Sequence, residues 1–389
     1  MTPADGEFEV AIRRLLRAPL LVSPAAAWGL ADEVASILGA TCGRLYVADY
    51  ALRRLQELDE AGTVNDPRDI AGTLAGRAFT SGQVLVSESN PTVLSVPLIE
   101  GTERIGLLEL EYGTWGGEIP PLLEPIVAVL VLMLVSKRRY SDQWVRARRS
   151  QPLSAAAEIQ WDLLPPLSCS TREVAVGGIL EPAYAIGGDS FDYAINGRSL
   201  EFAIVDAIGH GMSAVLMSTA AISSLRHARR SGTDVETTYR KVDELIATQF
   251  GECYYVTGQM GSLDVPTGVL TWLNAGHVPP MLVRNGTYAG ELTCAPSKPF
   301  GLGGPVAEVA RENLQRGDRV LFYTDGITES RAPNGAFFGQ DRLADFLVRA
   351  TLERVPVAET ARRLSENVVE YVGEGLKDDA TLLLIEYLG

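Results

Sequence analysis

Short apolar segments separated by glycine-rich turns dominate the chain from residue 168 onward, and they limit this part to folds built on antiparallel sheets. The segment DVPTG carries the Asp, Pro and Gly residues of a hairpin turn between two of these segments. Helical patterns interrupt the series at 213–230, 235–250, 341–349 and 357–371. The sequence therefore predicts an α+β fold here. Five segments are read as strands: LEFAIVDA, QMGSLD, GVLTWLNAG, RVLFYTDG and ATLLLIEYL.

The chain has 389 residues, which exceeds the size at which one hydrophobic core usually stops growing. We therefore expect an N-terminal domain at 8–135, a helical linker at 136–167 and a C-terminal domain at 168–389. The first stretch contains a helical pattern at 28–38, the strand-like GRLYVADY, and two further strands, VLSVPLIEG and RIGLLELEYG, joined by a tight turn at Glu100–Gly101. With the segment GTLAGRAFTSGQVLVSE, this pattern resembles a GAF sensory domain of α/β type.

The resemblance to GAF domains leaves the ligand of this domain open. All three histidines (His210, His227 and His277) lie outside it, so histidine-ligated haem is not expected. Cys42 could anchor a chromophore or sense redox state, or it could be a small buried hydrophobe. A domain used only for dimerisation is the other alternative.

Two helices are predicted between the N-terminal strands and residue 168. The run Ile126–Val135 is far shorter than the roughly 20 residues that span a membrane, so we read it as a buried helix that continues to about residue 149. Because its first part is apolar on almost every side, it predicts a homodimer. The second helix, in SAAAEIQWDLLPPL, should end at two prolines and is either a regulatory switch or a passive tether. Its candidate contact residues are Ile159, Trp161, Leu163 and Leu164.

Charge and cysteine usage exclude several functions. The formal net charge of −15 leaves no basic surface for nucleic acid, and it disfavours an anionic membrane. The four cysteines form no CxxC pair, which argues against a zinc knuckle or a disulfide framework and fits a reducing compartment. The N-terminus MTPADGEFEV carries acidic residues where an export signal has basic ones. We therefore expect a cytoplasmic protein.

Four acidic segments stand beside the predicted strands: GGDSFD, VDAIGHG, YTDGITE and KDDATLLL. In the last three, a carboxylate lies directly at the end of an apolar strand. Carboxylates at strand ends can converge on one point while the sheet holds them rigidly, which is what a metal site requires. Each segment alone could equally be an ordinary Asp–Gly turn.

Taken in order, the segments AYAIGGDSFD, VDAIGHG, LNAGHVPPML, YTDGITES and DDATLLL resemble the metal-dependent PPM protein phosphatases, in the SpoIIE/RsbU branch. The resemblance covers residues 168–389. It implies an α-β-β-α sandwich of two antiparallel sheets flanked by helices, with two Mn²⁺ or Mg²⁺ ions at one edge. Oxygen ligands from Asp suit such hard cations, and the few His and scattered Cys argue against zinc.

The resemblance also implies roles for individual residues. Asp206 would bridge both metals, the main-chain oxygen of Ala207 would bind one of them, and Asp325 and Asp378 would complete the shell of the second. Asp189 would hold metal-bound waters, so Asp189 and Asp206 are the catalytic candidates. Ala207 stands where many relatives have Gly, a change that a main-chain ligand tolerates. Three further residues are candidates for supporting positions: Asp192, His210 and Asp379.

The implied activity is hydrolysis of phosphoserine or phosphothreonine by activated water, without a phospho-enzyme. The leading substrate is a STAS-domain anti-anti-sigma factor. His210 and His277 could serve as general acids, although a turn-stabilising role is favoured for both. No arginine close to Asp189 in sequence is an evident phosphate ligand. The alternatives are a non-catalytic phosphoprotein-binding scaffold and a two-metal phosphodiesterase, for which the acidic chain lacks a basic groove.

Overall fold

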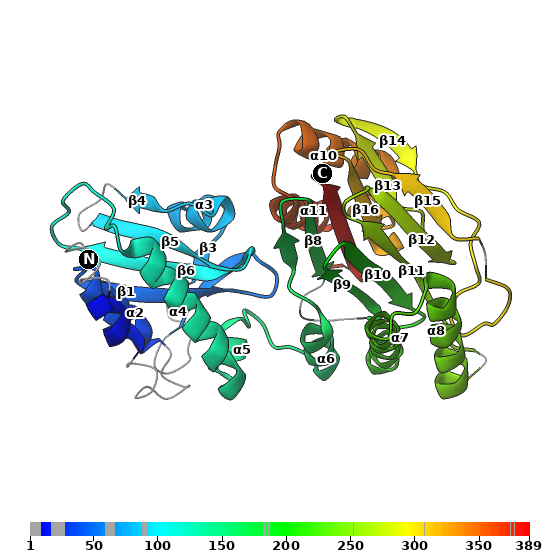
Figure 1. Cartoon of the computed structure of the whole chain (residues 1–389), viewed down its shortest axis with the longest axis horizontal. Coiled ribbons are helices and arrows are strands. Elements are labelled where there is room, and N and C mark those ends of the chain that lie inside the picture. Colours follow the sequence, from blue (N-terminus) through cyan, green and yellow to red (C-terminus); the bar gives the residue numbers. More distant parts are fainter. Residues whose placement is uncertain are drawn as a thin grey trace. The chain divides into compact units, whose positions relative to one another are not determined.

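The computed structural model describes residues 9–16, 28–58, 67–87, 92–181, 184, 187–251, 253–306, 308–373, 375–376 and 378–389. Several predictions concern residues outside these ranges: the N-terminal segment to Phe8, the end of the GAF-like segment at Glu88, and part of the AYAIGGD motif. The chain divides into two units, Met1–Pro152 and Leu153–Gly389, which are described one at a time (Figure 1). Their boundary lies within the predicted linker.

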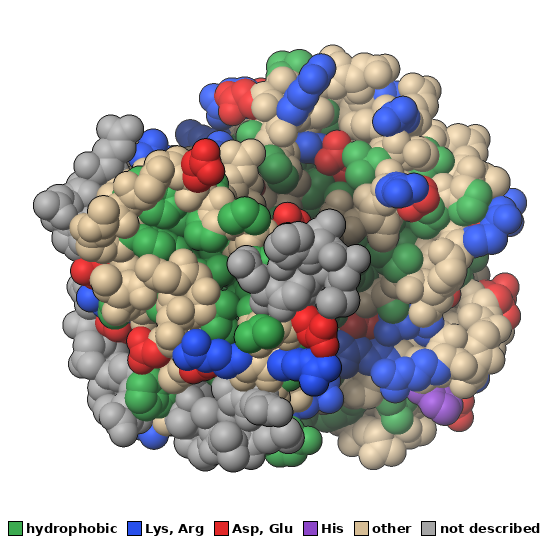
Figure 2. All heavy atoms as spheres, turned by 60° about the vertical axis from the view of Figure 1, so that its left-hand side comes forward, with side chains coloured by type: hydrophobic (Ala, Val, Ile, Leu, Met, Phe, Trp, Pro, Cys, Tyr) green, Lys and Arg blue, Asp and Glu red, His purple; other side chains and the backbone are tan. Residues whose placement is uncertain are grey.

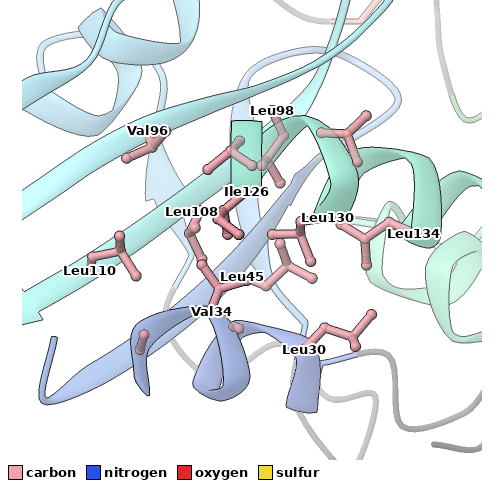
Figure 3. Packing of buried hydrophobic residues seen from close by; sticks show 14 of the residues in the cluster. Leu30, Val34, Leu45, Val96, Leu98, Leu108, Leu110, Ile126, Leu130 and Leu134 are labelled. Atoms are coloured by element: carbon pink, nitrogen blue, oxygen red, sulfur yellow. The ribbon is translucent and has the colours of Figure 1, made fainter. Parts of the chain in front are cut away.

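The N-terminal unit is built on one six-stranded sheet with the order β3-β2-β1-β6-β5-β4, in which every pairing is antiparallel. Side chains alternate between its two faces, so Leu45 and Leu108 face helices α2 and α4, whereas Tyr46 and Leu107 face helix α3. Figure 3 shows Val96, Leu98, Leu108 and Leu110 of the sheet packed against residues of α2 and α4. The bounds are α2 Gly29–Ile37, β1 Cys42–Ala48, β2 Arg54–Glu57, β3 Arg68–Asp69, α3 Leu74–Ser81, β4 Leu85–Ser87, β5 Thr92–Glu100, β6 Glu103–Tyr112 and α4 Leu123–Lys137.

The predicted hairpin is confirmed, because β5 pairs with β6 around a turn in which Gly101 has a φ of 61°. The prediction of one helix from Ile126 to about residue 149 is wrong. Helix α4 is followed by a 3₁₀ turn at Arg138–Tyr140 and a short helix α5 at Gln143–Ala147, with an extended residue, Ser141, between them. Ser and Asp side chains compete for backbone hydrogen bonds, which favours a helix end at this Ser-Asp pair.

Three observations bear on the earlier predictions, the first on this unit and the other two on the chain as a whole. Cys42 is half-buried at the start of β1, and burial raises the pKa of its thiol, which makes it less reactive. Among the described residues, no helix has the length and apolar character needed to cross a membrane. Figure 2 shows acidic and basic side chains interspersed over the face in view, so neither sign covers it alone.

The C-terminal unit is a sandwich of two antiparallel sheets, as predicted. The five-stranded sheet has the order β15-β12-β11-β10-β9 and the six-stranded sheet has the order β14-β13-β16-β17-β8-β7. Helices α7 and α8 pack on the first sheet, and α10 and α11 pack on the second (Figure 1). Between the sheets, the rings of Phe202 and Phe322 lie 4.5 Å apart. The apolar layer between the sheets thus fixes how the strand ends of one sheet face those of the other.

The five strands and four helices predicted for this unit from the sequence are all present, with bounds close to the predicted ones. Helix α8 begins at Val235 and ends at Phe250, as predicted, with the Asp234 side chain accepting the Thr237 N–H as an N-cap. The bounds are α6 Ala155–Leu163, β7 Ser168–Ser170, β8 Val174–Glu181, β9 Asp189–Asn196, β10 Ser199–Ala207, α7 Met212–Arg230, α8 Val235–Phe250, β11 Val256–Asp264, β12 Val269–Ala275, β13 Met281–Arg284, β14 Thr287–Glu291, β15 Ala310–Asn313, β16 Arg319–Tyr323, α9 Asp325–Thr328, α10 Gln340–Leu352, α11 Val357–Val372 and β17 Ala380–Tyr387.

Helix α6 is the second predicted linker helix, and it begins where Ser154 accepts a hydrogen bond from the Ala157 N–H. Its fully covered residues are Ala156, Ala157 and Gln160. The predicted contact residues Ile159, Trp161 and Leu164 are only partly buried, against a cluster that includes Leu180 of β8 and Val215 of α7. Leu163 packs instead against the cluster that α7 and α8 form with the first sheet.

Candidate metal-binding active site

The first two carboxylates of the site lie on neighbouring strands of the five-stranded sheet. Strand β9 begins at Asp189 and β10 ends at Asp206 and Ala207, and the pairing of these strands places Asp206 directly opposite Asp189. Asp189 is only 2% exposed, whereas Asp206 is half-buried. Because opposite residues in a sheet are neighbours on the same face, the two carboxylates meet at one sheet edge.

The other carboxylates come from the six-stranded sheet. Strand β16 is followed by Thr324 and by Asp325, the first residue of the short helix α9. The Thr324 hydroxyl donates to Asp189 Oδ2 at 2.6 Å, and it accepts a hydrogen bond from the Thr381 N–H of β17 at 3.0 Å. This buried threonine, which the sequence analysis missed, joins the two sheets at the site. Thr324 could have been identified from the sequence by its position in the YTDG segment, directly before Asp325.

Asp378 and Asp379, which precede β17, differ in environment. Asp379 is buried, and its carboxylate accepts hydrogen bonds from the backbone N–H of Gly187 at 2.8 Å and of Asp189 at 3.1 Å. Asp378 is exposed, and its Oδ1 accepts the Asp379 N–H at 3.0 Å. Asp379 therefore fixes the turn that leads into Asp189, while the Asp378 side chain lies at the surface beside it.

Burial and mutual repulsion raise the pKa values of these acids. Burial is the main cause that raises the pKa of Asp206 to about 7, and the nearby negative charges of Asp325, Asp378 and Asp379 raise it further. Burial and the neighbouring Asp206 raise the pKa of Asp189 well above its usual range, and burial raises that of Asp379 to about 6. Burial and Glu329 raise the pKa of Asp325. The site thus concentrates negative charge, and nearby carboxylates that cannot all ionise favour a cation.

The main-chain oxygen of Ala207 faces Gly188. A Cβ atom placed on Gly188 would lie 2.5 Å from this oxygen and 3.0 Å from the Cβ atoms of both Ala207 and Ala214. The absence of a side chain at Gly188 therefore leaves space in front of the carbonyl that the family resemblance assigns to a metal. Ala207 itself is buried, so its methyl group points away from solvent.

His277 has the structural role that was favoured for it. Its Nε2 donates to the Tyr323 carbonyl at 3.1 Å, which leaves Nδ1 to accept from the Thr257 hydroxyl at 3.0 Å. Its backbone N–H donates to the Asn274 side chain at 2.7 Å, which closes the NAGH turn. Burial lowers the pKa of His277 to about 4, so the ring is neutral at pH 7. A neutral, fully hydrogen-bonded histidine is unsuited to act as a general acid.

Two of the supporting candidates do not join the carboxylate group. Asp192 lies three residues after Asp189 on the same strand, and this odd spacing turns its side chain to the opposite face, where it pairs with Arg226 and Arg229 of α7. His210 is exposed in the loop between β10 and α7. The structure records no hydrogen bond between its side chain and any described residue, so the turn-stabilising role favoured for it finds no support.

Comparison with known proteins identifies the class of the C-terminal unit. Residues 196–388 match the family model of SpoIIE, described as stage II sporulation protein E. The SiaA-PP2C domain of Pseudomonas aeruginosa has the same fold, with a TM-score of 0.52 and 23% identity over 60% of this chain and 94% of that one. The C-terminal unit therefore belongs to the SpoIIE family and has the PP2C phosphatase fold. Asp189 lies just before the matched range but pairs with Asp206 within it.

Individual relatives cover only part of this chain. Protein IcfG of Synechocystis is 21% identical over 262 residues, which are 60% of this chain and 41% of IcfG. Phosphoserine phosphatase RsbU of Bacillus subtilis is 21% identical over 246 residues, which are 60% of this chain and 69% of RsbU. A structure of the RsbU and RsbW domains of Rv1364c from Mycobacterium tuberculosis has a TM-score of 0.50 and 28% identity, covering 58% of this chain and 61% of that one. This chain thus spans less than half of the first curated relative.

Proposed function

We propose that residues 153–389 hydrolyse phosphoserine or phosphothreonine in a protein substrate, with divalent metal ions held by the carboxylates of the two sheets. The observation that carries the proposal is the meeting of Asp189, Asp206, Asp325 and Asp379 at one edge of the sandwich, where burial and repulsion raise their pKa values. Membership of the SpoIIE family and the similarity to a phosphoserine phosphatase support this assignment.

The donor set fits Mn²⁺ or Mg²⁺. Asp206, the Ala207 carbonyl, Asp325 and Asp378 supply only oxygen atoms, which such hard cations prefer. By the family resemblance, Asp189 would hold waters of their shells. Among the described residues, no three acidic, His or Cys side chains already form a closed metal-binding group, so metal binding would draw the carboxylates together. When bound, two divalent ions would neutralise phosphate oxygens and lower the pKa of water.

The protein's own groups would position the reaction. Thr324 and Asp379 fix Asp189 from the second sheet, through its carboxylate and its backbone N–H respectively. Thr257 and His277 link β11 to the end of β16, just before Asp325. Asp189 and Asp206 are thus held on paired strands and by hydrogen bonds from the second sheet, so these two carboxylates are positioned before charge develops on the phosphate.

The test of this proposal compares Asp206→Asn and Asp325→Asn with the control Asp264→Asn. Asp264 is also an aspartate at a strand end, but it caps the exposed β11–β12 turn by accepting from Thr267. We expect phosphate release from phosphoserine peptides to need added Mn²⁺ or Mg²⁺, to collapse in the two site variants and to persist in the control. Circular dichroism checks that all variants are folded.

Other outcomes separate the alternatives. Full turnover by either folded site variant, or by metal-stripped protein, contradicts the proposed site. Hydrolysis of a cyclic dinucleotide or of DNA in place of the peptide supports a phosphodiesterase. Binding of the phosphopeptide without turnover under any metal condition supports a scaffold.

We further propose that the substrate is a phosphorylated STAS-domain regulator in the cytoplasm, and that the N-terminal unit is a GAF-like sensory and dimerisation domain. The family resemblance supports the substrate, and the free state of all four cysteines fits a reducing compartment. The exposed Leu132 on α4, at 69% accessibility, supports a homodimer through this helix. Helix α6, which packs on β8 and α7, would relay the state of the sensor to the catalytic site.

A further inference from the structure

Exposed apolar side chains gather at the end of the five-stranded sheet that carries Asp206 and Ala207. Ile208 follows Ala207 directly, and Met212 begins helix α7 four residues later. We call the set of five large side chains at this end the apolar rim, and each is between 38% and 46% exposed: Ile208, Met212, Leu216, Tyr254 and Leu302.

Backbone contacts bring three members of the apolar rim together from distant parts of the chain. The Ile208 N–H donates to the carbonyl oxygen of Tyr255 at 3.1 Å, which places Ile208 beside the segment that contains Tyr254. A Cβ atom built on Gly301 would lie 2.8 Å from the Tyr254 carbonyl oxygen, so Leu302 follows a residue that touches Tyr254. The ends of three segments thus lie side by side next to the carboxylate site.

Helix α7 supplies the other two members. Met212 and Leu216 are four residues apart, so they share one face of the helix, one turn above the other. Helices α7 and α8 pack against each other and are joined only by residues 231–234, which makes them antiparallel neighbours (Figure 1). The chain that leaves α8 therefore returns to the end where α7 begins, and it carries Tyr254 to the same end as Met212.

The apolar rim is uncharged in a strongly acidic protein. The chain from 207 to 230 contains no Asp or Glu, although the whole sequence contains 49 of them. A contiguous exposed apolar surface commonly marks a binding site for another protein. A phosphoserine that reaches the carboxylates must come within a few ångströms of Ala207, so the protein that carries it has to cover the surface that begins at Ile208. Continuity with the carboxylate site therefore favours the substrate as the partner of this surface.

We propose that the apolar rim is the docking surface for the phosphoprotein substrate and that it selects phosphoserines flanked by apolar side chains. The inference rests on the proposed function, because it names the class of substrate sequence for the same site. In an extended segment, the second and fourth residues on either side of the phosphoserine point to the same face as the phosphoserine itself. They lie about 7 and 14 Å from it, and apolar side chains there would be buried against the rim.

The experiment compares two phosphoserine peptides with the full chain in Mn²⁺. The peptides differ only at the second and fourth positions on each side of the phosphoserine, which are leucine in one peptide and serine in the other. The measured quantity is the ratio of kcat/KM for the leucine peptide to kcat/KM for the serine peptide. A loss of metal or of folded protein lowers both values, so the ratio reports docking alone.

The expected ratio is at least about tenfold in wild type, because several apolar side chains are buried on docking. The double variant Met212→Gln/Leu216→Gln should lower the ratio to below about threefold. Glutamine has nearly the helix propensity of methionine and leucine, so α7 should be retained. If the double variant does not fold, Leu216→Gln alone should lower the ratio about threefold.

The matched control is Leu352→Gln, at the end of helix α10. Leu352 is 65% exposed, and a Cβ atom built on Gly286 would lie 2.5 Å from its side chain, so it lies at the turn between β13 and β14. Strand β13 is antiparallel to β16 and its last residues pair with the start of β16, so this turn is at the end of the sheet opposite Asp325. Leu352→Gln should keep the wild-type ratio.

Three results would overturn the proposal: a wild-type ratio near one, a wild-type ratio in the double variant, or an equal fall in Leu352→Gln. If the double variant loses a dimer in light scattering and keeps the peptide ratio, the rim binds a second copy of this chain instead. If wild type hydrolyses neither peptide, the proposed function fails. The ratio is then taken from the dissociation constants of fluorescein-labelled peptides, measured by anisotropy in Mg²⁺, and it still decides whether the rim is a docking surface.

Discussion

Gly188 offers a sharp test of the role of the Ala207 carbonyl, because alanine there adds one atom in front of it. The new Cβ would lie 2.5 Å from the oxygen and 3.0 Å from two other Cβ atoms, so the backbone around Ala207 must shift by several tenths of an ångström. The φ angle of Gly188 is outside the left-handed region, so steric crowding is the only new cost. Overpacking of this kind costs about 1–3 kcal/mol of unfolding free energy.

The expected effect on activity is larger than the effect on stability. For a domain of this size the loss corresponds to a fall in melting temperature of roughly 2–12 °C. A misplacement approaching 1 Å at a reacting centre can cost about 100-fold in rate. We therefore expect Gly188→Ala to remain folded at 25 °C but to lose about 100-fold in Mn²⁺-dependent phosphate release from a phosphoserine peptide.

The matched control is Gly261→Ala in the middle of β11. Its Cβ would lie 2.4 Å from another backbone oxygen, that of Thr271, so the crowding is of the same kind. Gly261 pairs with Phe202, four positions along β10 from Asp206 and thus about 13 Å from the site. We expect a similar fall in melting temperature with little loss of rate per folded molecule. Wild-type activity in Gly188→Ala, or an equal loss in both variants, would refute a role for the Ala207 carbonyl.

Three further predictions address other parts of the chain. Burial lowers the pKa of His277 to about 4, whereas the unfolded chain keeps it near 6.5, so the unfolding free energy should fall as the pH drops from 6.5 to 4. In urea denaturation this fall should be up to about 3 kcal/mol larger in wild type than in His277→Gln, and parallel pH profiles of the two proteins would contradict the buried neutral ring. Leu132→Glu on α4 should convert a dimer into a monomer in light scattering, and a wild-type monomer at tens of micromolar would count against the proposed interface. Ile159→Ala or Leu163→Ala on α6 should change apparent Mn²⁺ affinity severalfold, whereas unchanged Mn²⁺ titrations in both would make α6 a passive tether.

Much of the C-terminal fold could be predicted because its strands are short apolar runs that end in acidic turns. Strand β8 escaped prediction because Gly177 and Gly178 in its centre look like a turn. The structure shows why both are glycine: a Cβ on Gly178 would lie 2.4 Å from the ring of Phe191, and one on Gly177 would lie 3.0 Å from the Val357 carbonyl. Glycine is needed at both positions because strand β9 and helix α11 approach β8 closely there, and this packing cannot be inferred from one sequence.

The candidate site was predictable in composition but only partly in geometry. Asp192 was grouped with Asp189 because the segment GGDSFD was not recognised as the start of a strand; once β9 is known, their odd spacing places them on opposite faces. Thr324 was missed because it acts through a contact between segments far apart in sequence. Such contacts depend on how helices and sheets pack, whereas strand-end carboxylates can be read from local pattern alone.

The division of the carboxylates between two sheets explains how a concentrated negative charge can persist in a folded domain. Asp189 and Asp206 belong to one sheet, whereas Asp325, Asp378 and Asp379 flank strands of the other. The apolar contacts between the sheets therefore work against the repulsion among these acids, and the Thr324 bond to Asp189 holds the sheets together at the site. Small changes in the position of β9 alter the spacing of acids across this boundary.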